Sequence, residues 1–122
     1  MSTAAWVDLE ADQGADFGVQ LYWLDPVLTP YQLLAPMKME IRQLDNLRLV
    51  HTLTSTDSAG ITFSASNGLI QLIIPRTVTD GMKPDTYLYD LFVTYRQDPT
   101  TTRVRKLIRG NFILNAKVTQ SV

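Results

Sequence analysis

Cysteine is absent from the 122 residues of this sequence. Its absence excludes disulfide bonds, thiol catalysis, thiolate zinc sites and redox switching. A domain of this length buries roughly two-thirds of the surface that its unfolded chain exposes, so its core can stabilise it without a cross-link. We therefore expect a single domain spanning residues 1–122, with no metal and no cofactor. A chelator should leave its melting temperature unchanged.

Positive charge is not in surplus, because 11 lysine and arginine residues face 12 acidic ones and the net charge is −1. Proteins that mainly bind nucleic acid normally show a basic surplus, so we expect no nucleic-acid partner. Long apolar runs are also missing, since stretches such as Leu72-Ile73-Ile74 are far shorter than the roughly 20 residues of a membrane-spanning helix. Residues 1–5 lack the basic start and apolar stretch of a signal peptide. These absences predict a protein made in the cytoplasm, with no membrane partner.

Apolar residues recur with a period of two along most of the chain, which is typical of strands with one buried face. The clearest case is residues 37–42, where Met37, Met39 and Ile41 alternate with charged side chains. Turn-forming residues separate such segments every eight to twelve positions, so we expect seven or eight strands in a sandwich or small barrel. Between residues 76 and 85 one helical turn fits, with Thr77 or Thr79 as its cap.

The core is predicted from the residues that share one alternation phase within each strand. In the last strand, residues 103–118, this phase places Val104 on the same face as Ile108, Phe112 and Leu114, with Gly110 at a bulge. The core residues that we expect are Phe17, Val19, Leu21, Trp23, Met39, Ile41, Leu72, Tyr89, Leu91, Val93 and Phe112.

Two tyrosines indicate the type of sandwich. Tyr87 fits the tyrosine corner of immunoglobulin-like folds, in which the hydroxyl bonds back to the preceding loop, and Tyr89 would then be the core position two residues later. The alternative is that both only pack against neighbouring strands. We expect an all-β fold, an immunoglobulin-like antiparallel β-sandwich of about seven or eight strands.

Residues that could carry chemistry are few. His51 is the only histidine and lies in the middle of a strand, so we expect a packing residue rather than a catalytic or metal-binding one. The spacing of Asp8, Glu10 and Asp12 would suit calcium, but a calcium-loop pattern is missing and a solvated strand face fits better. Glu40 and Asp90 would meet across the sheets as a glycosidase-like pair only by accident. We therefore expect no catalytic residue and no enzyme.

Basic residues concentrate on the last predicted hairpin. The strand alternation places Arg103, Arg105 and Arg109 on one face, with Lys106 between them. Guanidinium groups bind carboxylate and phosphate alike. Three partners come into question: the acidic N-terminal strand of the same chain, an acidic patch on a neighbouring subunit, and phosphate. We favour the two protein partners because the chain is acidic overall, and we name Arg103, Arg105, Lys106 and Arg109 as a candidate partner interface.

The order of short motifs resembles small immunoglobulin-like virion proteins of tailed bacteriophages. Residues 12–17, Asp-Gln-Gly-Ala-Asp-Phe, resemble the opening "E-Q-G-A-T-F" of that family, and a strand ending in Trp23 follows. Residues 31–42 stand where the family has "L-T-G-Y-x-x-R-M-Q-I-R", although residues 25–36 lack its Thr-Gly-Tyr turn and contain Pro36. Residues 60–74, 85–91 and 105–119 resemble the family's next hairpin, its "G-x-Y-x-Y-D-L" motif and its closing strand.

The resemblance covers nearly the whole chain, and its plan is similar to the N-terminal domain of phage baseplate upper proteins. It implies a non-enzymatic structural component of the virion, made in the host cytoplasm and contacting other virion proteins and copies of itself in a symmetric assembly. Residues 1–5 and 119–122 would then be tails that order on contact. A module that joins tail, baseplate or fibre-attachment parts is favoured over a decoration protein of the head. A carbohydrate-binding module is the remaining alternative, with Trp6, Tyr22, Trp23, Tyr31 and Tyr95 as sugar platforms.

Overall fold

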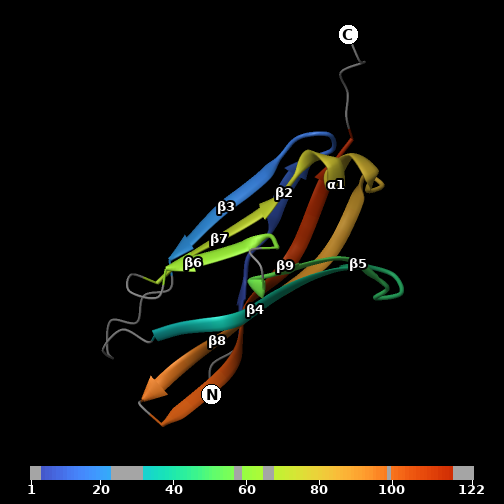
Figure 1. Ribbon diagram of the computed structural model, residues 1–122. Helices are drawn as coiled ribbons and strands as arrows, with labels where there is room; N and C mark the ends of the chain where they lie inside the picture. Colours follow the sequence, from blue (N-terminus) through green and yellow to red (C-terminus); the bar gives the residue numbers. More distant parts are fainter. Residues whose placement is uncertain (1–3, 23–31, 57–58, 65–67, 99, 117–122) are drawn as a thin grey trace.

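The computed structural model describes residues 4–22, 32–56, 59–64, 68–98 and 100–116, and Figure 1 shows the course of the chain. Within these residues it has nine strands and one short helix. The elements are β1 (Ala5–Trp6), β2 (Leu9–Asp12), β3 (Phe17–Tyr22), β4 (Gln32–Gln43), β5 (Leu49–Thr54), β6 (Ile61–Ser64), β7 (Leu69–Ile74), α1 (Arg76–Gly81), β8 (Asp85–Asp98) and β9 (Thr101–Asn115). No helix of the described residues is long and apolar enough to cross a membrane.

The strands form two sheets (Figure 1). The larger sheet has the order β1-β9-β8-β4-β5, with β2 also paired to β9, and the smaller has the order β3-β7-β6. Neighbours are antiparallel except that β1 and β2 run parallel to β9. Strands β3, β7 and β6 take the B, E and D positions of an immunoglobulin fold, β4, β8 and β9 the C, F and G positions, and β5 the additional C′ position. The chain is an all-β immunoglobulin-like sandwich, which confirms the predicted fold class.

The core lies between the two sheets. Of the predicted core residues, Val19 and Leu21 are partly buried and packed against it, and Trp23 lies outside the described residues. Alternation in β4 holds as predicted, since Met37, Met39 and Ile41 are fully buried. The predicted positions that are buried are Phe17, Met39, Ile41, Leu72, Tyr89, Leu91, Val93 and Phe112.

Replacing Leu91 with alanine is expected to lower the free energy of unfolding by about 2–5 kcal/mol, because the side chain is fully buried in the middle of β8 and its removal leaves a cavity. Leu88→Ala is the matched control, since Leu88 is on the same strand but only partly buried, and its loss should be smaller. Denaturant midpoints measure both. An unchanged midpoint for Leu91→Ala would show that this face of β8 does not pack in the core.

The tyrosine corner is confirmed. The hydroxyl of Tyr87 donates a hydrogen bond to the carbonyl of Lys83, in the loop between α1 and β8. Tyr89 is buried two residues later, and its hydroxyl donates to the carbonyl of Val7 at 2.5 Å. Burial raises the pKa of both phenols, and the nearby carboxylates of Asp85 and Asp8 raise them further. Both hydroxyls therefore remain protonated donors that tie β8 to other parts of the chain.

The predicted helical turn is present as α1, but its cap differs from the prediction. Pro75 occupies the N-cap position and no side chain caps the helix. Thr79 is instead fully buried. Its hydroxyl donates to the carbonyl of Ala15 at 2.8 Å and accepts from the amide of Gly14 at 3.2 Å. Thr79 thus joins α1 to the turn between β2 and β3.

Strand β9 departs from the predicted alternation because of a bulge. Leu91 pairs with Ile108 and the next residue of β8, Phe92, pairs with Lys106, so Leu107 is an additional residue in β9. The bulge inverts the phase on its N-terminal side, and Val104 is therefore 68% exposed rather than on the face of Ile108. Gly110 is not the bulge, since it pairs regularly with Tyr89.

Strand β4 begins earlier than predicted. The sequence predicts a loop through Pro36, because proline cannot donate to a ladder. The strand instead starts at Gln32 and its pairing with β8 shifts register between Leu34 and Lys38, which accommodates the proline. The carbonyl of Pro36 accepts a hydrogen bond of 2.7 Å from the hydroxyl of Thr94. At the N-terminus β1 already includes Ala5, inside the range expected as a tail, while residues 119–122 lie outside the described part.

Candidate functional site

The outer face of the larger sheet, turned away from the core, carries a hollow that we call the outer-face groove. Its volume is about 250 Å³. Strands β1, β4, β8 and β9 and the turn after β4 contribute to it. The lining residues are Trp6, Glu40, Arg42, Leu47, Leu88, Tyr89, Asp90, Lys106, Arg109 and Gly110.

Two carboxylates meet in this groove. Glu40 on β4 and Asp90 on β8 are direct cross-strand partners in one sheet. The prediction that they would meet only by accident, and across the two sheets, is wrong. Strand β4 corresponds to C and β8 to F, and these are neighbours in the immunoglobulin topology. Like charges directly opposite each other destabilise a sheet, so cations must compensate them.

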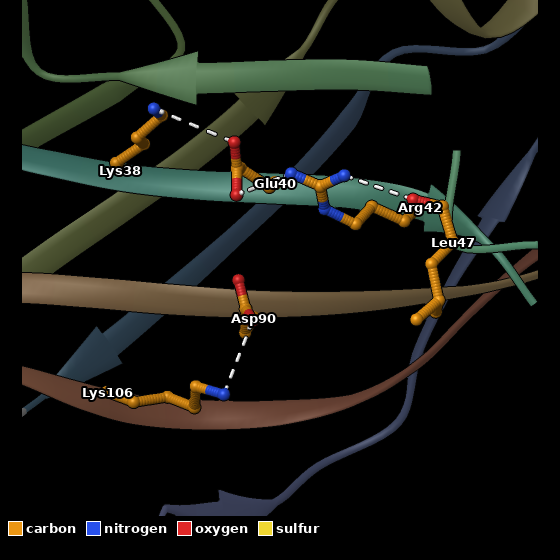
Figure 2. Close-up of polar contacts among 6 residues, drawn as sticks. All are labelled: Lys38, Glu40, Arg42, Leu47, Asp90 and Lys106. Atoms are coloured by element: carbon orange, nitrogen blue, oxygen red, sulfur yellow. Dashed lines mark hydrogen bonds and ion pairs between the residues drawn. The ribbon is translucent and has the colours of Figure 1, made fainter. Parts of the chain in front are cut away.

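Basic side chains surround the two carboxylates, as Figure 2 shows. Glu40 uses both of its oxygens: Oε2 lies 3.6 Å from Lys38 Nζ, and Oε1 accepts a hydrogen bond of 3.1 Å from Arg42 Nη2. On the β8 side, Asp90 Oδ2 lies 3.5 Å from Lys106 Nζ. Its other oxygen, Oδ1, is buried and has no hydrogen-bond partner among the described residues. With Glu40 held by two cations, this arrangement does not provide the free carboxylate pair of a glycosidase.

Trp6 and Arg109 form the β1 side of the groove. They are register partners in the parallel β1–β9 pair, and the guanidinium carbon of Arg109 lies 5.8 Å from the centre of the Trp6 ring. The indole Nε1–H donates to Asp8 Oδ1 at 2.9 Å, and the amide of Asn111 donates to the same oxygen at 3.1 Å. The 57% exposed indole is thus fixed from both sides of its own strand.

Leu47 forms the opposite side of the groove, in the turn between β4 and β5. Its backbone adopts a positive φ of 59°, which is uncommon for a branched side chain. The carbonyl of Leu47 accepts a hydrogen bond of 3.0 Å from Arg42 Nη1 (Figure 2). Leu44 and Leu49, on either side of it in the sequence, are also exposed, at 52% and 46%. The turn therefore presents three leucines to solvent.

The four basic residues predicted as one interface lie on two faces. The bulge at Leu107 places Arg103 and Arg105 opposite Tyr95 and Val93, whereas Lys106 and Arg109 are opposite Phe92 and Asp90 on the outer face. The prediction that Arg103, Arg105 and Arg109 share a face is therefore wrong. Lys106 pairs with Asp90 and not with the N-terminal carboxylates.

The N-terminal carboxylates form no metal site in the described part of the chain. Glu10 and Asp12 alternate with buried Leu9 and Ala11 and are exposed, as predicted for a solvated strand face. Asp8 lies just before β2 and accepts the two hydrogen bonds from Trp6 and Asn111.

His51 lies in β5, opposite Ile41, and is only partly exposed. Burial lowers its pKa below the usual 6.5. The unfolded chain therefore binds a proton more readily than the folded one. This position fits the predicted packing residue.

We expect the protein to lose stability as the pH falls from about 6.5 through the lowered pKa of folded His51. Above pH 6.5 the histidine is neutral in both states and its contribution is fully present. Denaturant midpoints at pH 7.5 and 5.5 measure the effect, and the matched control is His51→Gln, which cannot titrate. Equal pH dependence of the two proteins would contradict the prediction.

The aromatic residues proposed as sugar platforms do not gather on one surface. Tyr95 is buried, and Trp6 and Tyr22 are exposed but belong to different sheets. Trp23 and Tyr31 lie outside the described residues. One face of Trp6 is approached by Arg109, which leaves less of the indole for stacking a sugar ring.

The groove itself was missed from the sequence. Trp6 and Arg109 are far apart in the chain, and only the parallel pairing of β1 with β9 brings them together. The available signal was the F-to-C neighbourhood of an immunoglobulin fold, which predicts that the alternating charges of residues 38–42 lie beside Asp90.

Comparison with known proteins adds one distant structural likeness. No family model matches the chain, and no curated protein matches it. The solution structure of the first Ig-like domain of human CD48 antigen is similar over 100% of this chain and 92% of that domain, at 10% sequence identity and a TM-score of 0.37. The fold assignment above comes from the strand order and the tyrosine corner of the chain itself.

Proposed function

We propose that this protein is a non-enzymatic structural component of a tailed-phage virion, an immunoglobulin-like module that joins tail, baseplate or fibre-attachment parts. The observation that supports this role best is the distribution of basic residues on both faces of the β8–β9 hairpin. Arg103 and Arg105 lie on one face, Lys106 and Arg109 on the other, and exposed Val104 lies among them. The turn of this hairpin lies at the end of the molecule away from α1 (Figure 1).

A hairpin with this distribution suits contacts with more than one neighbour. Exposed ion pairs within a domain stabilise it by only about 0–1 kcal/mol, so its own fold gains little from such a cluster. At an interface that is partly shielded from water, guanidinium–carboxylate bonds also fix the orientation of the partner. The order of the sequence motifs, which resembles virion proteins, supplies the assembly in which these neighbours occur.

The test is the presence of the protein in purified particles and the effect of charge reversal. Arg105→Glu and Arg109→Glu, alone and together, should reduce incorporation while the melting temperature of the isolated protein stays within a few degrees. Arg76→Glu, at an exposed position on α1, is the matched control and should be incorporated normally. A protein that is absent from purified particles would refute the proposed function. Normal incorporation of the double variant would refute the role of the hairpin.

A further inference from the structure

Arg109 has binding capacity that the described structure does not use. Its guanidinium stacks near the Trp6 ring, and in the described part of the chain it forms no ion pair with a carboxylate. Its cross-strand partner Asp90 pairs with Lys106 instead. A guanidinium stacked on an aromatic face keeps its N–H donors directed outward in the plane of the group, where they match the two oxygens of a carboxylate.

The surroundings of Arg109 are organised before any partner arrives. Asp8 holds the Trp6 indole and is itself held by the amide of Asn111. The backbone of Val7, next to Trp6, donates to the carbonyl of Arg109 at 2.8 Å. A site whose side chains are already fixed loses little conformational entropy when it binds, which favours affinity.

The charge of the groove indicates what it accepts. Three basic side chains, Arg42, Lys106 and Arg109, line it together with two acidic ones, Glu40 and Asp90, which leaves one positive charge in excess. Both oxygens of Glu40 are occupied, whereas Asp90 Oδ1 has no donor. The complementary ligand carries a carboxylate and, close to it, an N–H or O–H donor.

The sides of the groove favour a protein as the source of that ligand. Trp6 and Leu47 line it at opposite sides, and Leu49 is exposed beside Leu47. Exposed tryptophan and arginine are enriched at the centres of protein interfaces. An acidic peptide residue supplies a carboxylate and a backbone N–H together. An acidic sugar would need the face of Trp6 that Arg109 approaches.

We propose that the outer-face groove binds an aspartate or glutamate side chain of a neighbouring virion protein, with Arg109 as the carboxylate-binding residue and Trp6 as its support. This inference rests on the proposed function and specifies one of its contacts. It assigns the contact to the groove between β1 and the β4–β5 turn, so that Arg103 and Arg105, on the other face, have no part in it.

Photo-crosslinking inside particles tests the contact. A crosslinking amino acid at Leu49, 46% exposed, lies beside the groove, and the control position is Ile73, 47% exposed in the other sheet. Crosslinks from Leu49 should join a peptide that contains aspartate or glutamate. Their yield should fall at least fivefold with Arg109→Gln, fall less with Arg109→Lys, and stay unchanged with Arg76→Gln. Crosslinks from Ile73 should not depend on Arg109.

The outcomes separate the two proposals. If the protein is missing from particles, the proposed function fails; if it is present but Leu49 gives no crosslink, or one that survives Arg109→Gln, only the groove assignment fails. A synthetic copy of the crosslinked peptide is then titrated into the isolated ¹⁵N-labelled protein, and the Trp6 indole signal, assigned with Trp6→Phe, should shift. An equal shift with the amide version of the acidic residue would overturn the carboxylate assignment. A shift at lower concentration with glucuronate would overturn the peptide in favour of an acidic sugar.

Discussion

Replacing Gly110 with alanine should lower the free energy of unfolding by about 3 kcal/mol, although the change adds only one methyl group. A Cβ at this position would lie 2.1 Å from the carbonyl oxygen of Val7 and 2.7 Å from its carbonyl carbon. Both atoms belong to the backbone between β1 and β2, which cannot rotate away as a side chain can. The same carbonyl accepts the hydrogen bond of the buried Tyr89 hydroxyl, so a displaced Val7 also leaves that donor without its partner.

Gly81→Ala is the matched control for this prediction. Nothing lies within 4 Å of a Cβ at Gly81, at the end of α1, so its stability should be unchanged or rise slightly. Denaturant midpoints compare the two variants with the parent protein. The Trp6 indole signal should also move in Gly110→Ala, because β1 is held against β9 next to this position. A Gly110→Ala protein as stable as Gly81→Ala would show that β1 and β2 do not cross β9 closely.

Much of the fold could be predicted because period-two alternation directly reports one buried face. Met37, Met39 and Ile41 in β4 and Leu91 and Val93 in β8 are fully buried as the alternation requires. The tyrosine corner was predictable for a similar reason, since the hydroxyl of Tyr87 reaches only four residues back along the chain. Local spacing decides both features.

The errors arise where one residue changes the phase. The additional residue Leu107 in β9 moves Val104 to the outer face and separates Arg109 from Arg103 and Arg105. A bulge depends on the partner strand, and the sequence around Leu107 contains no glycine or proline to indicate it. At Pro36 the opposite error occurs: the residue that suggests a break lies within a strand whose register shifts around it.

The candidate site was beyond sequence reasoning because it depends on pairings between distant segments. The register of β4 with β8 brings Glu40 to Asp90, and the parallel register of β1 with β9 brings Trp6 to Arg109. The basic residues could be named from the sequence, but their partners could not. Arg109 was predicted as an interface residue, whereas the tryptophan that supports it was considered only as a sugar platform.

The largest loss of stability among single substitutions is expected for Phe112→Ala, about 3–5 kcal/mol. The side chain is fully buried in β9, and its ring meets that of Phe17 in the other sheet edge to face, with centres 5.3 Å apart. Removing it therefore creates a cavity at a place where the two sheets are in direct contact, and also removes an aromatic pair.

Phe92→Ala provides the comparison, because Phe92 is an aromatic residue of the same sheet on the opposite face. It is only partly buried, and Lys106 Nζ lies 5.4 Å from the centre of its ring. Its removal costs little burial and one exposed cation–π contact of about 0.5–1 kcal/mol, so the loss should be well below that of Phe112→Ala. Chemical denaturation of both variants measures the difference. Equal losses would mean that the outer face of the larger sheet is covered as closely as the core, which would contradict the position of the groove.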